Sequence, residues 1–103
     1  MHEIDLEKAQ REETRWRILR ILDAGRPVAV SESVIYRALA DASLPVTPLT
    51  LRRELGYLRD KELIEVPSLD GVSWSASLTG HGVDVVEYTV TAPAGIARPN
   101  KWW

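Results

Sequence analysis

The sequence predicts an α+β fold, mainly helical with a small β-ribbon, and two observations carry this prediction. Leu51, Leu55 and Leu58 recur at i, i+4 and i+7, which places them on one face of a short amphipathic helix. Asp70-Gly71 is a strong hairpin signal between two β-compatible runs. A helix, a two-stranded ribbon and a closing helix, in this order, form the second half of a winged helix-turn-helix. The sequence therefore predicts that fold, which presents one helix to a DNA major groove.

The first half of the chain predicts a helix, a short strand and a second helix. Residues 3–24 are good helix formers, and Gly25-Arg26-Pro27 ends that helix. Residues 28–30 can form a short strand that joins the later ribbon as its third member. Ser31 or Ser33 then caps the second helix, because a serine hydroxyl accepts a hydrogen bond from a free N–H group of the first turn.

The second half follows the same reasoning. Thr47-Pro48 predicts the start of the third helix, with a side-chain cap followed by a proline in the first turn. Residues 63–66 and 72–76 are the two expected strands of the ribbon. Thr79 is the expected cap of a short last helix.

Composition indicates one small domain. The chain has 103 residues, of which 45% are hydrophobic and 27% are charged, which is ordinary globular usage. It has no cysteine, which excludes a disulfide framework and a zinc finger, and it has no long apolar run or signal-peptide pattern. We expect a winged helix-turn-helix domain over residues 1–91, an irregular tail over residues 92–103, no cofactor, no membrane association and a reducing, cytosolic compartment.

The charge balance is unusual for a DNA-binding domain, because the formal net charge is −2. Residues 1–26 hold six basic and six acidic side chains, and residues 27–79 hold five basic against seven acidic ones. The chain from residue 80 onward holds two of each. Affinity for DNA must therefore come from the local arrangement of charges and not from the overall field.

The third helix supplies the candidate DNA contacts. A step of 100° per residue places Arg53 opposite the leucine face, where a guanidinium group could reach the O6 and N7 atoms of guanine. Thr50, Arg52 and Tyr57 lie toward the flanks and suit phosphate contacts, and Thr47 stands at the start of the helix. The alternative is that these arginines are merely solvated. The predicted wing tip has no Lys or Arg, so we expect its Asp70 to serve turn geometry.

Two surfaces at the chain ends are candidates for self-association. Leu6 lies in the polar N-terminal turns of the first helix, which we expect to project from the domain. The tail contains Ile96 and ends in Trp102 and Trp103, and an exposed apolar pair is costly to leave in water. We expect these four residues to contact a second copy in a homodimer. Docking on the chain's own domain, or on a phage or host protein, remains an alternative.

The sequence shows no enzyme signature. His2 and His81 have no carboxylate or cysteine at metal-ligand spacing. No serine lies in a nucleophile elbow, and no glycine-rich phosphate loop is present. We therefore expect neither a catalytic centre nor a metal site.

Four segments also carry a resemblance to a known family: TRWRILRIL, SESVIYRAL, TPLTLRRELGYLRDKELIEV and WSASLTGHGVDVVEYTVTAPAGIARP. Together they resemble small winged-helix proteins of Mu-like transposable phages and prophages. The resemblance implies a protein of phage origin that is associated with DNA in the bacterial cytoplasm, and it identifies no operator, ligand or catalytic residue. From the predicted fold and the third helix we expect its partner to be double-stranded DNA. The combined prediction is a prophage transcription regulator. The alternative is a winged-helix module that joins phage or host proteins and does not bind DNA.

Overall fold

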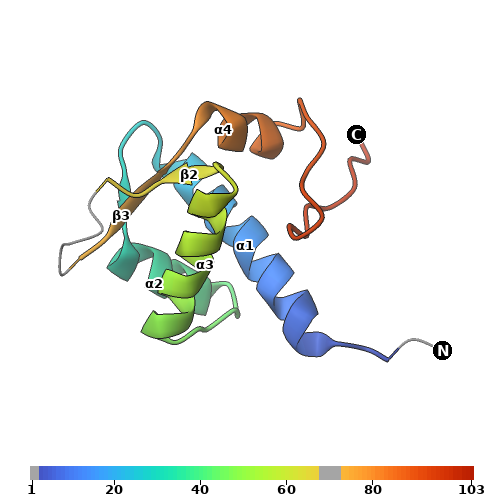
Figure 1. Cartoon of the computed structure of the whole chain (residues 1–103), viewed down its shortest axis with the longest axis horizontal. Helices are drawn as coiled ribbons and strands as arrows, with labels where there is room; N and C mark the ends of the chain where they lie inside the picture. Colours follow the sequence, from blue (N-terminus) through green and yellow to red (C-terminus); the bar gives the residue numbers. More distant parts are fainter. Residues whose placement is uncertain (1–2, 68–72) are drawn as a thin grey trace.

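The computed structural model describes residues 3–67 and 73–103 and confirms the predicted α+β class and winged-helix fold (Figure 1). In chain order the elements are α1 (Leu6–Gly25), β1 (Val30–Ser31), α2 (Glu32–Asp41), α3 (Pro48–Asp60), β2 (Ile64–Glu65), β3 (Ser75–Leu78) and α4 (Gly80–Val86). The predicted wing tip with Asp70-Gly71 and the residue His2 lie outside the described residues. Among the described helices, none is long and apolar enough to cross a membrane.

Side-chain caps determine where the helices begin. The side chains of Ser31, Thr47 and Thr79 accept hydrogen bonds from the backbone N–H groups of the helices that follow them, as predicted. Asp5 does the same for α1 by accepting from the N–H of Lys8. The first helix therefore begins three residues later than the sequence suggested.

The three strands form one antiparallel sheet in the order β1-β3-β2, so the predicted third strand does join the ribbon. Val30 pairs with Ala76, and Ile64 pairs with Leu78. Both β1 and β3 begin later in the chain than predicted, and β3 ends at Leu78, beyond the predicted end at residue 76. The shift has a packing reason, because the observed register buries Ala76 completely.

The hydrophobic core lies where α1, α2, α3 and α4 meet the sheet. Leu51, Leu55 and Leu58 of α3 are at most 2% exposed, which confirms the predicted core face of this helix. The remaining buried hydrophobic side chains come from all parts of the described chain: Trp16, Ile18, Leu19, Leu22, Ile35, Leu39, Leu63, Ile64, Val66, Ala76, Val85 and Ile96. The core therefore holds α3 in place by one face and leaves the opposite face outside.

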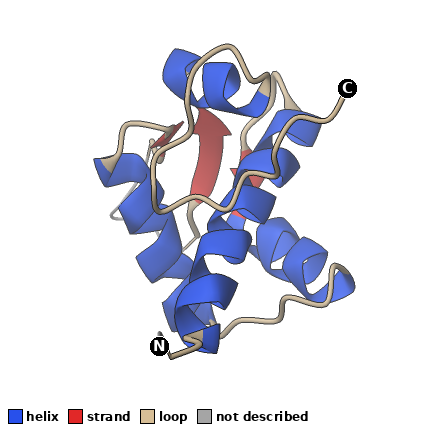
Figure 2. Ribbon diagram, turned by 90° about the vertical axis from the view of Figure 1, so that its right-hand side faces the viewer, coloured by secondary structure: helices blue, strands red, loops and turns tan. Residues whose placement is uncertain are grey.

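The C-terminal tail contains no helix or strand in residues 92–103, as predicted, but it is fastened to the domain (Figure 2). Ile96 is buried in the core of its own chain, and the N–H of Ala97 donates to the carbonyl oxygen of Glu12 at 3.1 Å. Arg98 donates to the carbonyl oxygens of Val85 and Val90 at 2.9 and 2.8 Å. The prediction that Ile96 contacts a partner is therefore wrong, because this side chain completes the core.

Candidate nucleic-acid interface

The outer face of α3 is exposed along its length, opposite the buried leucines. Leu49 is 68% exposed, and Arg53 is exposed one turn further along the helix. Within the described part of the chain, the Arg53 guanidinium has no ion-pair or hydrogen-bond partner. Its five N–H donors are therefore available to an outside acceptor. This agrees with the predicted position of Arg53.

The first turn of α3 presents hydroxyl groups beside this arginine. The Thr47 hydroxyl accepts from the Thr50 N–H at 3.1 Å and donates to the Thr50 hydroxyl at 3.0 Å. Thr47 is exposed and Thr50 is half-buried. Their predicted phosphate contacts remain predictions. A phosphate oxygen could still accept from the Thr50 hydroxyl, because the short bond to Thr47 uses only its acceptor side.

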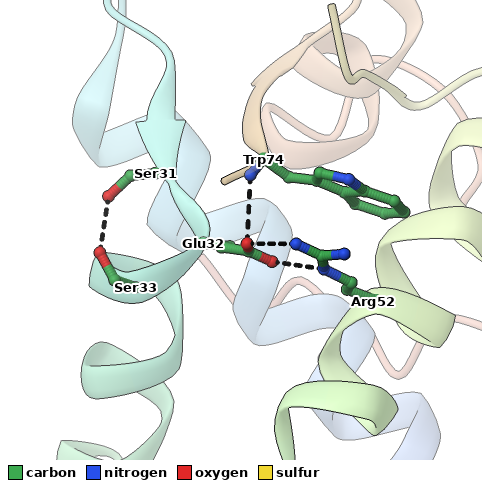
Figure 3. Close-up of polar contacts among 5 residues, drawn as sticks. All are labelled: Ser31, Glu32, Ser33, Arg52 and Trp74. Carbon is green, nitrogen blue, oxygen red and sulfur yellow. Dashed lines mark hydrogen bonds and ion pairs between the residues drawn. The ribbon is translucent and has the colours of Figure 1, made fainter. Parts of the chain in front are cut away.

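Arg52 lies in an internal cluster with Glu32 and Trp74 (Figure 3). Its Nε and Nη2 atoms donate to the two Glu32 carboxylate oxygens at 2.9 and 2.7 Å, and its guanidinium lies 4.7 Å from the Trp74 ring centroid. The Glu32 carboxylate also accepts from the Trp74 backbone N–H at 3.1 Å. The hydrogen bond from Arg52 is the main reason that the pKa of Glu32 falls below its ordinary value. Arg52 is therefore engaged within its own chain, and its predicted phosphate contact stays a prediction.

This cluster joins three elements that are distant in sequence. Glu32 is the first residue of α2, Arg52 belongs to α3, and Trp74 directly precedes β3. The bidentate ion pair thus fixes α3 relative to the ribbon that leads into the predicted wing. The sequence offered no local signal for it, because Glu32 and Arg52 are 20 residues apart.

A second internal ion pair accounts for Tyr57. Arg15 of α1 lies 3.6 Å from the Tyr57 ring centroid, and its Nε donates to the carboxylate of Glu54 at 2.7 Å. A Cβ atom at Gly95 would overlap the Tyr57 hydroxyl, so this side chain packs against the tail. The ring of Tyr57 therefore lies close to α1 and the tail, and its predicted phosphate contact stays a prediction.

The two terminal tryptophans are exposed in the single chain. Trp102 is 86% exposed and Trp103 is 65% exposed. Trp103 makes edge contacts with Trp102 and with Tyr88, at ring-centroid distances of 5.7 and 5.2 Å. Leu6, in the first turn of α1, is also 68% exposed. These three predicted contact residues therefore remain available to a partner, unlike Ile96.

No protein-family model and no curated protein matches this sequence. Two solved structures of the same protein, RosR from H. salinarum, are similar to it. RosR grown from NaBr is 27% identical over 74% of this chain and 67% of that chain, with a TM-score of 0.65. The structure of a complex of hsRosR-S1 is 28% identical over 73% of this chain and 65% of that chain, with a TM-score of 0.63. The chain thus spans about two thirds of the length of the RosR structures it matches, and it shares their winged-helix fold.

Proposed function

We propose that this chain is a DNA-binding transcription regulator that presents α3 to the major groove of double-stranded DNA. The observation that carries the proposal is the exposed outer face of α3, on which Arg53 has no partner within the described residues. RosR, a winged-helix transcription regulator, supports it through similarity over about three quarters of this chain. In such a complex the Arg53 guanidinium would contact a guanine edge, and the Thr47-Thr50 turn would lie against the phosphate backbone.

Duplexes selected for binding from a random-sequence pool test the proposal. We expect binding, measured by fluorescence anisotropy, to weaken steeply with added salt, because bound phosphates release counterions. Arg53→Ala should cost about 1–3 kcal/mol and relax specificity at one base position. Arg17→Ala is the matched control, because it removes the same charge from an exposed position on α1. Equal losses in the two variants would remove the outer face of α3 from the interface.

We also propose that the active form is a homodimer. A single domain with few unpaired basic side chains gains useful affinity when two recognition helices lie about 34 Å apart on the DNA. Leu6, Trp102 and Trp103 supply exposed apolar surface for this association. Replacing both tryptophans with alanine is a cleaner test than truncation after Pro93, because truncation would also remove Ile96 from the core. Sedimentation equilibrium should show weaker association for the double variant, and a wild-type monomer at tens of micromolar would refute the dimer.

We further propose that this regulator belongs to a bacterial prophage. The resemblance of the sequence to winged-helix proteins of Mu-like phages supports this. The alternative function is a protein-interaction module. One observation favours it, since the outer face of α3 carries the 68% exposed Leu49 while the whole chain has a net charge of −2. Failure to bind any duplex at low salt, with the helix content of the chain intact by circular dichroism, would favour this alternative.

A further inference from the structure

An open cleft lies between the N-terminal half of α1 and the turn that leads into α3. Its volume is about 450 Å³, which lies within the range of sites for small organic ligands. Arg11 and Thr14 line it from α1, Leu44 and Val46 line it from the turn, and Arg53 lines it from α3. Thr47 and Thr50 also line it, so the cleft shares three residues with the proposed DNA-binding face.

Thr14 contributes a hydroxyl group to the lining of the cleft, although the residue as a whole is only 4% exposed. A hydroxyl can both donate and accept a hydrogen bond. A polar group of a ligand in the cleft could therefore bond to Thr14.

The charges around the cleft define the class of ligand. Arg11 and Arg53 come from opposite walls, and neither has an ion-pair partner among the residues that the structure describes. Of the two carboxylates in the lining, Glu54 is neutralised by Arg15 at 2.7 Å, which leaves Glu7 against two guanidinium groups. The balance is positive and favours an anion.

The turn between α2 and α3 gives the cleft an apolar wall. Leu44 and Val46 are both half-buried there and pack against the hydrophobic core. A purely inorganic anion would leave this wall in contact with water, whereas an organic body would cover it. The lining thus suits a charged group next to an apolar body.

We propose that the cleft binds a small organic anion, with a carboxylate or a phosphate ester attached to an apolar body. The charged group would lie between Arg11 and Arg53, because a guanidinium fork donates two parallel hydrogen bonds to either anion. Occupation would engage Arg53, so ligand and DNA would weaken each other's binding by the same factor. This regulatory part rests on the proposed DNA-binding function, whereas ligand binding itself does not.

Amide NMR titration of the ¹⁵N-labelled full chain tests the ligand site without DNA. The probes are benzoate, phenyl phosphate, the neutral benzyl alcohol and inorganic phosphate, each up to about 10 mM, which detects a Kd near 1 mM. We expect saturable shifts at cleft amides with benzoate, phenyl phosphate or both, and the stronger binder identifies the charged group. Absence of such shifts with both organic anions would overturn the proposal, as would equal shifts with benzyl alcohol or inorganic phosphate.

Two variants separate a ligand contact from a structural role. The stronger binder of the two organic anions serves as the active probe. Arg11→Gln should weaken its binding at least about tenfold, whereas Arg17→Gln, elsewhere on α1, should leave its binding unchanged. Thr14→Val should also weaken binding, because it removes a hydroxyl group from the lining of the cleft. Equal affinity in the Arg11 and Arg17 variants would overturn the site.

The competition with DNA is measured last, by anisotropy with and without the active probe. We expect the probe to raise the Kd for the duplex in the wild-type chain and to have a smaller effect in Arg11→Gln. A chain that binds the organic anion but no duplex would overturn the proposed function and the competition, and would leave the ligand site standing. A duplex affinity unaffected by saturating probe would overturn the competition alone.

Discussion

Replacing Glu54 with methionine should destabilise the fold strongly, because it leaves the Arg15 guanidinium without a counter-charge inside the protein. The Glu54 side chain is 3% exposed and that of Arg15 is 12% exposed. Their contact is a pair of hydrogen bonds, 2.7 Å from Nε to Oε2 and 3.5 Å from Nη2 to Oε1. Methionine has a similar length and is apolar, so the variant removes the charge and both acceptors with little change in volume.

The magnitude follows from burial. Removing one partner of a buried ion pair costs about 3–5 kcal/mol. Arg15 would keep its bond to the Gly95 carbonyl at 3.2 Å and its contact with the Tyr57 ring. We therefore expect a cost at the lower end of this range, about 3 kcal/mol. The total free energy of unfolding of a domain of this size is about 5–15 kcal/mol. The thermal midpoint should fall by about 12–24 °C, at roughly 4–8 °C per kcal/mol.

Urea unfolding followed by far-ultraviolet circular dichroism measures this change. The double variant Arg15→Met, Glu54→Met should recover most of the lost stability, because it removes both buried charges. Asp60→Ala is the exposed control, since this side chain is 73% exposed and pairs with Arg59 at 3.4 Å. It should cost less than about 1 kcal/mol. A single Glu54 variant within about 0.5 kcal/mol of wild type would refute the reasoning, as would a double variant as unstable as the single one.

Two further predictions concern acid stability and backbone packing. Because the folded-state pKa of Glu32 is lowered from 4.5, its ion pair stabilises the fold above that pH, and the contribution is lost as the pH falls through the lower folded value. Glu32→Gln should thus be less stable than wild type at neutral pH, and this difference in stability should disappear below pH 4.5. A difference in urea midpoints that does not change with pH would contradict this. Gly82→Ala should cost about 1–3 kcal/mol, because a Cβ there would overlap the Leu63 carbonyl oxygen, which the backbone holds in place. Gly56→Ala on α3, where a Cβ meets nothing within 4 Å, should instead stabilise by about 0.5–1 kcal/mol, and equal effects in thermal melts would refute the comparison.

The elements of the fold that depend on neighbouring residues could be predicted from the sequence. Thr47 and Thr79 cap the helices that follow them, since each hydroxyl bonds to an N–H three residues later. The leucine spacing in α3 gave the correct core face and therefore the outward position of Arg53. Strand positions were predicted less well, because the register depends on which residues of β1 and β2 pair with β3.

The candidate site was predictable only in part. Helical geometry places a side chain on a face, but it does not show what occupies that face. Arg52 and Tyr57 are on the flanks of α3, as predicted, yet Glu32 and Arg15 take them into internal contacts. The cleft beside Arg53 had no signal in the sequence either, because its walls come from α1, the turn before α3 and α3 itself.

By itself the sequence determined the class of fold, the helix caps and the outward face of α3, because each depends on residues within about one or two helical turns of one another. Only the tertiary structure decided the partners of the charged and terminal residues. Arg52 and Glu32 are 20 residues apart, Arg15 and Glu54 are 39 apart, and Arg15 and Gly95 are 80 apart. Ile96 belongs to the core for the same reason, since the tail reaches it only by packing against α1. Periodicity carries no information over such separations, so these contacts arise from how the elements pack together.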